Sequence, residues 1–289
     1  MKITRLNIPS LVVGESPIWD SESNLLYLVD ILGHKALSYD VKSDTAQTWD
    51  MPGPIGALVL RKSGGAIVAV KQGIYGFDPA SGGLDPIAKI ERADSVQFND
   101  GKVDHRGRFM VCTLSLDRNA GNIGELYRLD ADQKLHVLDE GIGVGNGPCW
   151  SPDGKTFYFA DTRIKKIYAY DYDEATGGVS NRRVFADTTE IGGEPDGATV
   201  DRDGLLWMTV SQSYKIVVYR PDGKIERTIE MPVSLPASLT FGGDNLDRLF
   251  VTTIDPAPAY NMPELGEGGG TYVIDGLGAR GIEEPRYAG

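Results

Sequence analysis

The chain contains 289 residues and carries a formal charge of −12 at pH 7, because 41 acidic side chains outnumber 29 basic ones. This charge disfavours binding to nucleic acid or to anionic lipid, and a chain of this length buries enough surface to fold without a disulfide framework. Its two cysteines, Cys112 and Cys149, lie in apolar stretches, which is typical of free buried thiols.

No targeting or membrane-spanning segment is evident. The first ten residues include no apolar run of the signal-peptide type, and no segment approaches the about 18 consecutive apolar residues of a spanning helix. We therefore expect a soluble cytoplasmic protein that binds neither membranes nor nucleic acid, as a monomer or a small homo-oligomer.

Short strands dominate the predicted secondary structure. Apolar or alternating runs of strand length recur at residues 25–29, 66–70, 156–160 and 216–219, and turn dipeptides such as Asp153-Gly154 separate such runs. No amphipathic helix longer than two turns is evident, and 36 residues are glycine, which favours turns. The sequence predicts an all-β protein.

The predicted strands fall into six similar units. In each unit an apolar strand leads through a polar turn to a second apolar strand and then to a further strand. The first strands carry aligned apolar residues roughly 40 to 50 residues apart, namely Trp19, Val59, Val103, Trp150, Val200 and Phe241. This period predicts a six-bladed β-propeller with four-stranded blades, formed by residues 1–289 as a single domain. Residues 2–6 have no partner in their own unit, so we expect this N-terminal strand to close the last blade beside residues 271–274.

One position of the repeat is polar in four of the six units. Four residues before each aligned apolar residue, where the chain enters the innermost strand, the sequence has Glu15, Ile55, Asn99, Asn146, Asp196 and Ala237. The ring symmetry of a propeller predicts that the four polar side chains converge on its axis. Oxygen ligands with two negative charges suit a hard divalent cation, with Ca²⁺ expected first and Mg²⁺, Mn²⁺ or Zn²⁺ as alternatives. Asp and Asn also form turns, but Glu15 is a poor turn former, so four such residues at one position favour a metal site.

Hydrolysis by a serine nucleophile is disfavoured. His34, His105 and His136 share no position in the repeat, and the chain has no Gly-x-Ser-x-Gly motif. Chemistry centred on a metal is therefore favoured over a Ser-His-Asp triad.

Several motifs resemble those of the family of senescence-marker-protein-30, gluconolactonases and luciferin-regenerating proteins. They span nearly the whole chain and are Gly14-Glu-Ser-Pro-Ile-Trp19, Phe98-Asn-Asp-Gly-Lys-Val-Asp104, the stretch from Asn146 to Gly154, Pro195-Asp-Gly197 and Gly276-Leu-Gly-Ala-Arg-Gly281. The resemblance implies a six-bladed propeller with one divalent cation on its axis, held by Glu15, Asn146 and Asp196. It also implies a substrate-binding role for Asn99 and the hydrolysis of sugar lactones, so that the expected partner is a small-molecule lactone.

One position departs from the pattern of that family. Many members have Arg two residues before the Asn of the Asn-Asp-Gly motif, where it contacts sugar hydroxyls, and this chain has Gln97 there. A neutral amide replaces a charged group with five donors, so a different lactone or a different pose is expected. Asp117 matches the acidic substrate contact of the family.

The mechanism that these residues predict is metal-assisted ester hydrolysis. The cation polarises the lactone carbonyl, and Asp196 acts as the general base for the attacking water. Glu15 and Asn146 hold the ion, while Asn99 and Gln97 orient substrate hydroxyls. Two alternatives stay open: hydrolysis of phosphotriesters or other esters by the same residues, and a calcium-binding regulatory protein whose ion only ties the blades together.

Overall fold

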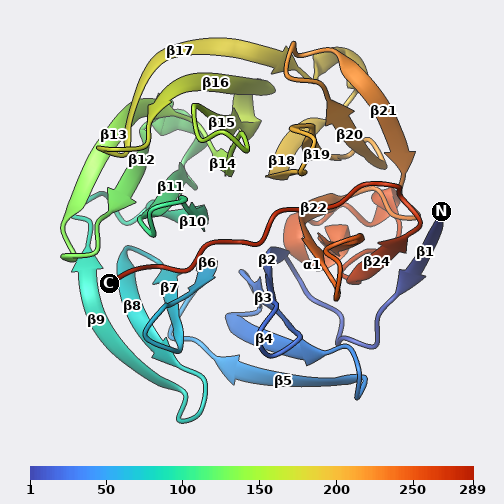
Figure 1. Cartoon of the computed structure of the whole chain (residues 1–289), viewed down its shortest axis with the longest axis horizontal. Helices are drawn as coiled ribbons and strands as arrows, with labels where there is room; N and C mark the ends of the chain where they lie inside the picture. Colours follow the sequence, from blue (N-terminus) through green and yellow to red (C-terminus); the bar gives the residue numbers. More distant parts are fainter.

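Six four-stranded antiparallel sheets stand around a central axis as the blades of a propeller (Figure 1). The computed structural model describes residues 1–289, apart from the side chain of Arg118. Blades 1 to 3 contain β2 (Gly14–Asp20), β3 (Leu25–Asp30), β4 (Lys35–Asp40), β5 (Thr45–Asp50), β6 (Ile55–Leu60), β7 (Ala66–Val70), β8 (Gly73–Asp78), β9 (Gly83–Lys89), β10 (Val96–Val103), β11 (Phe109–Ser115), β12 (Gly124–Leu129) and β13 (Leu135–Ile142). Blades 4 to 6 contain β14 (Gly145–Trp150), β15 (Thr156–Asp161), β16 (Lys166–Asp173), β17 (Gly178–Asp187), β18 (Glu194–Val200), β19 (Leu206–Ser211), β20 (Lys215–Tyr219), β21 (Ile225–Glu230), β22 (Pro236–Gly242), β23 (Arg248–Thr253), β24 (Tyr272–Asp275) and β1 (Lys2–Arg5). The all-β, six-bladed architecture predicted from the repeat is confirmed.

Helical structure is confined to short turns between strands. These are η1 (Arg118–Ala120), η2 (Thr162–Ile164), η3 (Thr189–Ile191), α1 (Pro256–Tyr260) and η4 (Pro263–Leu265). In the part of the chain that the structure describes, no helix has both the length and the apolar character needed to cross a bilayer.

The first strand of the chain closes the ring. β1 pairs antiparallel with β24 at the outer edge of blade 6, with Ile3 opposite Ile274. Figure 1 shows the N-terminus beside this blade, although the other strands of the blade come from the C-terminal part of the sequence. The predicted closure is confirmed, and with β1 the last blade has four strands like the others.

Apolar side chains fill the space between adjacent blades. Trp19 of blade 1 stacks on Phe250 of blade 6, and Trp207 of blade 5 meets Phe241 of blade 6 edge-on, each pair with ring centroids 5.3 Å apart. Aromatic pairs of this kind add to the stability gained from burial alone. Both cysteines are free and buried in these layers, as predicted. The close packing makes the blades a rigid frame around the axis.

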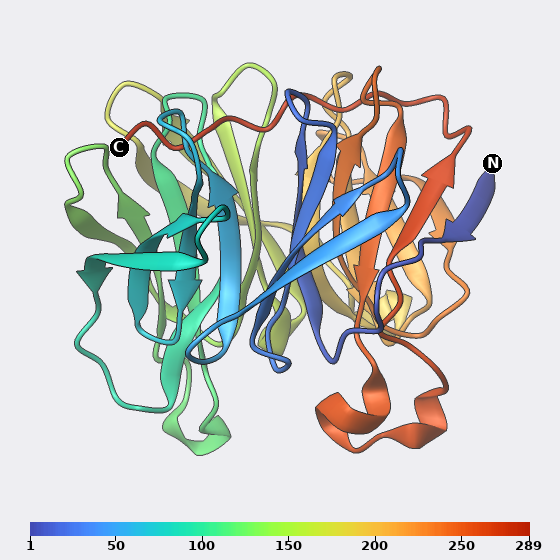
Figure 2. The ribbon, with the colours of Figure 1, turned by 90° about the horizontal axis from the view of Figure 1, so that it is seen from below.

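The two ends of the propeller differ. The inner strands β2, β6, β10, β14, β18 and β22 all start at one end, the mouth, where the loops between the second and third strands of each blade also lie. At the opposite end, the tail end, the C-terminal segment of residues 276–289 crosses the axis (Figures 1 and 2). The Gly281 N–H donates to Leu246 O at 2.7 Å, and the Tyr287 N–H donates to Leu60 O at 2.8 Å. This segment therefore joins blade 6 to blade 2 across the tail end.

Candidate metal centre

The four polar residues predicted at the axis lie at equivalent points of four inner strands. At or just after this point each strand carries a β-bulge, which shifts its register against the second strand of the blade and changes the direction of the side chains there. The four side chains are buried, with 4–6% of their surface exposed. They are Glu15 on β2, Asn99 on β10, Asn146 on β14 and Asp196 on β18.

Glycines in the bulges let neighbouring inner strands approach closely. Gly147 has a φ of +58°, and a Cβ added to it would lie 2.8 Å from the carbonyl oxygen of Asp196. A Cβ on Gly197 would lie 2.2 Å from Ser238 Oγ of the next blade. Only glycine permits both the left-handed backbone at Gly147 and this spacing, so the polar residues of adjacent blades come together.

Hydrogen bonds fix the orientation of the two carboxamides. Both amide hydrogens of Asn99 are used, because Nδ2 donates to Gly145 O and to Asn146 Oδ1, each at 2.9 Å. Nδ2 of Asn146 donates to Thr162 Oγ1 at 2.8 Å, and the Thr162 hydroxyl donates to Pro195 O at 2.7 Å. This network leaves Asn99 Oδ1, and a second lone pair on Asn146 Oδ1, free to face a ligand.

The two carboxylates lie in an environment that disfavours their charge. Burial raises the pKa of Glu15 well above its ordinary value, and the nearby carboxylates of Asp196 and Asp100 raise it further. Burial and the charge of Asp100 raise the pKa of Asp196 to about 8, although Ser211 Oγ donates to its Oδ2 at 3.2 Å. The carboxyl groups of Glu15 and Asp196 are within hydrogen-bonding reach of each other, yet Glu15 Oε2 is fully buried without a partner.

Asp100 is a site residue that the sequence analysis did not single out. Its Oδ2 accepts a hydrogen bond from the Gly147 N–H at 2.9 Å and its Oδ1 accepts one from the Gly101 N–H at 2.8 Å. It therefore ties the bulge of blade 4 to that of blade 3. Its place in the Asn-Asp-Gly motif, beside Asn99, was the available signal.

Lys102 is the basic residue of β10 and follows Asp100 by two positions. It is buried, and its Nζ donates to Glu284 Oε1 of the C-terminal segment at 2.7 Å. The charge of Lys102 lowers the pKa of Asp100, but burial outweighs it and the pKa is raised. Because Lys102 is already paired with Glu284, it does not serve as a counter-ion for Glu15 or Asp196.

The two predicted substrate contacts, Gln97 and Asp117, lie in different surroundings. Gln97 lies on β10 two residues before Asn99, is buried, and makes no side-chain hydrogen bond to any described residue. Its amide is therefore available to a ligand. Asp117 is exposed in the loop between β11 and β12, where its Oδ1 accepts a hydrogen bond from the Asn119 N–H at 2.9 Å and caps η1. Asp117 lies on the edge of the mouth and has a local structural role.

These features fit a divalent cation at the axis. Among the residues with described side chains, no group of three or more His, Cys, Asp and Glu suits a metal, so a ligand set here depends on carboxamide oxygens as well. An unpartnered buried carboxylate oxygen, a second carboxylate and oriented carboxamides form an oxygen-only set, which suits Ca²⁺ better than it suits zinc.

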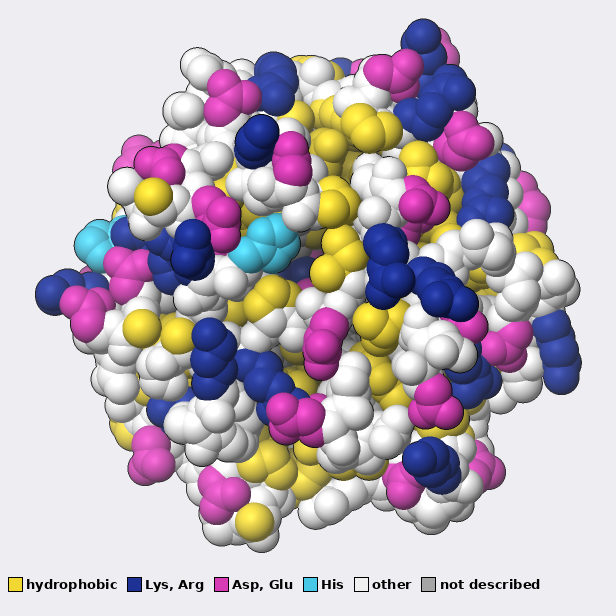
Figure 3. Space-filling view, in the orientation of Figure 1, with side chains coloured by type: hydrophobic (Ala, Val, Ile, Leu, Met, Phe, Trp, Pro, Cys, Tyr) yellow, Lys and Arg dark blue, Asp and Glu magenta, His cyan; other side chains and the backbone are white. Residues whose placement is uncertain are grey.

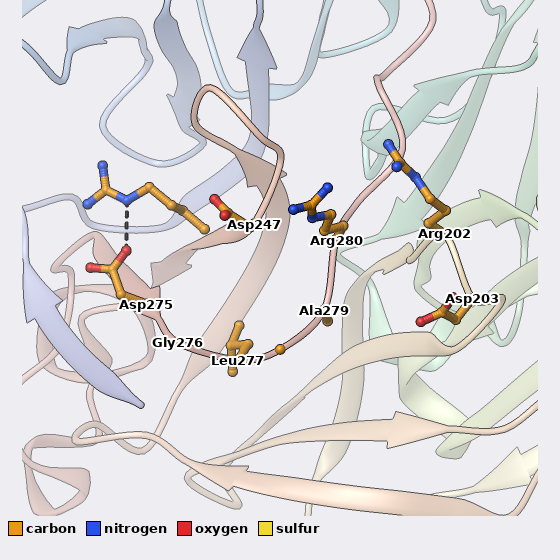
Figure 4. Close-up of a pocket in the computed structure, with 10 residues that line it drawn as sticks. Arg202, Asp203, Asp247, Asp275, Gly276, Leu277, Ala279 and Arg280 are labelled. Atoms are coloured by element: carbon orange, nitrogen blue, oxygen red, sulfur yellow. Dashed lines mark hydrogen bonds and ion pairs between the residues drawn. The ribbon is translucent and has the colours of Figure 1, made fainter.

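A separate cavity of about 480 Å³ lies at the tail end, under residues 276–280 (Figure 4). Arg248 Nε is bonded to Asp275 Oδ1 at 2.8 Å, and Arg202, Arg280, Asp203 and Asp247 complete its charged lining. Three Arg and three Asp balance in charge there, so the cavity has no electrostatic preference for an anion or a cation.

Known proteins resemble this chain over most of its length. Residues 13–255 match the model of the SMP-30/Gluconolactonase/LRE-like region. Regucalcin of Xenopus laevis is 33% identical over 290 residues, covering 96% of this chain and 95% of that protein. The structure of a luciferin-regenerating enzyme superposes with a TM-score of 0.92 at 27% identity, covering 99% of both chains. A calcium-binding protein, regucalcin, from Agrobacterium tumefaciens has a TM-score of 0.89 at 26% identity, covering 98% of this chain and 96% of that one. The chain therefore belongs to the SMP-30, gluconolactonase and luciferin-regenerating-enzyme-like family, as its motifs predict.

Proposed function

We propose that this protein is a metal-dependent lactonase, which hydrolyses a sugar lactone or a related lactone to the hydroxy acid. The observation that supports this most directly is the buried Oε2 of Glu15, which has no hydrogen-bond partner and lies beside the carboxyl group of Asp196. Burial without a counter-ion disfavours the ionised form of both carboxyl groups, and a bound cation would favour it. Membership of a family that includes gluconolactonases supports the reaction class.

Glu15, Asn146 and Asp196 would hold the cation. Ca²⁺ is proposed first because all the ligand atoms are oxygen, with Mg²⁺, Mn²⁺ and Zn²⁺ as alternatives. When bound, such an ion supplies Lewis-acid polarisation of the lactone carbonyl and stabilises the negative charge that develops in the transition state. The Thr162 hydroxyl keeps the Asn146 amide turned so that its oxygen, and not its nitrogen, is presented.

Asp196 is the proposed general base. Ser211 Oγ donates to Oδ2, which leaves Oδ1 to take a proton from the attacking water. The water oxygen forms a bond to the carbonyl carbon. When the ring C–O bond breaks, the proton passes from Asp196 to the departing alkoxide, and the free hydroxy acid results. The site is buried, so its electrostatic interactions are stronger than they would be in water.

Asn99 and Gln97 are proposed to orient the substrate. Asn99 offers only an acceptor, because both of its amide hydrogens are already bonded to blade 4. The Gln97 amide offers both a donor and an acceptor. Together they suit a substrate hydroxyl, which can donate to one group and accept from the other.

Replacement of Asp196 by Asn tests the role of the base. The variant keeps the size of the side chain, and we expect turnover of a lactone at saturating Ca²⁺ to fall by about 10²- to 10⁴-fold while the circular dichroism spectrum is retained. Asp203→Asn, an exposed carboxylate at the tail end, is the control and should keep full activity. A wild-type rate in Asp196→Asn would remove Asp196 from the mechanism.

A calcium-binding role without catalysis is the second candidate. It is favoured by the relatives named regucalcin, one of which is described as a calcium-binding protein. It predicts that Ca²⁺ raises the melting temperature while neither a lactone nor an organophosphate ester is turned over. An organophosphate ester hydrolysed faster than every lactone would instead favour a phosphotriesterase.

A further inference from the structure

Exposed apolar side chains are distributed unequally between the two ends of the propeller. Ten large apolar side chains are exposed in the described structure. Met1 precedes β1 at the tail end, beside Gly276, and Val137, Val184 and Ile225 lie on the outer strands β13, β17 and β21. The other six all lie in loops at the mouth, and none of the ten lies in a described loop at the tail end.

We name these six residues the apolar rim. They belong to the loops between the second and third strands of five blades, and they are 40–62% exposed. The apolar rim consists of Leu32 in blade 1, Leu116 in blade 3, Ile164 in blade 4, Tyr214 in blade 5, and Tyr260 and Met262 in blade 6. Scattered single apolar side chains are ordinary, but all six lie at the end where the inner strands that carry Glu15, Asn99, Asn146 and Asp196 begin.

Two loops carry half of the apolar rim and stand on opposite sides of the axis. Residues 116–123 of blade 3 carry Leu116, and residues 254–271 of blade 6 carry Tyr260 and Met262. Blades 3 and 6 face each other in a ring of six, and Figure 2 shows both loops projecting beyond the other loops at the end away from the C-terminal segment. We call these two loops the walls of the mouth, because they stand on opposite sides of it.

The tail end offers a contrast to the mouth. The C-terminal segment crosses the axis there, and its Glu284 pairs with the buried Lys102. Lys, Arg, Asp and Glu side chains are scattered over this end, with hydrophobic side chains visible between them (Figure 3). Glu15, Asn99, Asn146 and Asp196 lie near the starts of their inner strands, and therefore toward the mouth.

We propose that the apolar rim binds an apolar substituent of the substrate, an alkyl chain or an aromatic ring attached to the lactone. This inference rests on the proposed function, since it places the lactone ring at the axis and its substituent at the mouth. A lactone with hydroxyls along its whole length would meet apolar side chains there and lose hydration without new hydrogen bonds.

Binding of a homologous series tests the proposal. The probes are δ-lactams, which resemble δ-lactones but resist hydrolysis, with alkyl chains of zero to six carbons, titrated calorimetrically in the presence of Ca²⁺. We expect the affinity to rise about two- to fourfold per methylene over the first few carbons. The double variant Leu116→Ser/Met262→Ser, which alters both walls, should lose most of this dependence.

The control variant is Val137→Ser/Ile225→Ser, at outer strands where the side chains are 48% and 47% exposed. It removes a similar exposed apolar surface away from the mouth and should keep the dependence on chain length. Absent binding, an affinity independent of chain length, or equal losses in both double variants would overturn the proposal.

Turnover of the matching δ-lactones separates this inference from the proposed function. Turnover that is equal for all chain lengths, together with flat lactam binding, would leave the lactonase standing and refute the role of the apolar rim. Lactam affinity that rises with chain length, without turnover of any lactone, would refute the lactonase and keep the apolar rim as a binding surface.

Discussion

Removal of the metal should make the stability of this protein depend on pH between 4 and 8. The pKa of Asp196 is about 8 in the folded metal-free protein, against 3.8 as its ordinary value, and that of Glu15 is also raised. A carboxyl group whose pKa is raised by folding stabilises the fold below its unfolded pKa, and this contribution is lost as the pH rises toward the folded pKa.

The magnitude follows from the size of the shift. Between pH 4 and pH 7 the unfolded state loses the Asp196 proton while the folded state keeps it, so the free energy of unfolding should fall by about 4 kcal/mol. Glu15 acts in the same direction. A bound divalent cation favours both ionised carboxylates, so saturating Ca²⁺ should remove most of this decline.

Urea unfolding with chelator or with Ca²⁺ at pH 5, 6, 7 and 8 measures the effect. Asp196→Asn cannot ionise, so the metal-free variant should show a shallower decline and should exceed the wild type in stability at pH 8. Asp171→Asn is the control, because hydrogen bonds from Asn181 and Arg183 lower the pKa of that exposed carboxylate. A metal-free stability that is constant from pH 5 to pH 8, or equal slopes in wild type and Asp196→Asn, would refute the reasoning.

Three further predictions concern the residues around the site. Thr162→Val removes the acceptor that orients Asn146, so the affinity for Ca²⁺ measured by calorimetry should fall about 10- to 100-fold, whereas Thr162→Ser should keep it. Equal affinities in Thr162→Val and the wild type would contradict the role of the hydroxyl. Glu284→Gln leaves Lys102 buried without its ionic partner and should lower the free energy of unfolding by about 3 kcal/mol. The double variant Lys102→Met/Glu284→Leu should recover most of that free energy, and an unchanged urea midpoint in Glu284→Gln would count against a buried ion pair. Gln97→Arg should lower the KM for a hydroxylated aldonolactone relative to the KM for an unsubstituted lactone. A ratio of these two KM values equal to that of the wild type would show that the side chain at position 97 does not contact substrate hydroxyls.

The repeat allowed the blades and the four inner-strand positions to be predicted. Every unit places the same backbone geometry at the same offset, so Glu15, Asn99, Asn146 and Asp196 could be identified as equivalent without a structure. The closing strand was predictable because residues 2–6 had no partner in their own unit and were therefore expected beside residues 271–274.

Contacts between blades could not be predicted in the same way. Asp100 binds the Gly147 N–H only because bulges in two adjacent inner strands bring these groups together. Thr162 and Ser211 act on Asn146 and Asp196 from positions that no local pattern distinguishes from ordinary strand ends. Such roles depend on register and on close approach, which become visible only when neighbouring blades are placed side by side.

The most direct test of a metal-dependent lactonase is proton release at constant pH from a panel of lactones, with and without metal. Chelator-stripped protein should be inactive on all of them, and addition of Ca²⁺, Mg²⁺, Mn²⁺ or Zn²⁺ should restore turnover of at least one lactone, with Ca²⁺ expected to be effective. Turnover that is unaffected by stripping would contradict a metal at the axis, and no turnover with any ion, while Ca²⁺ still raises the melting temperature, would contradict catalysis and leave the calcium-binding role.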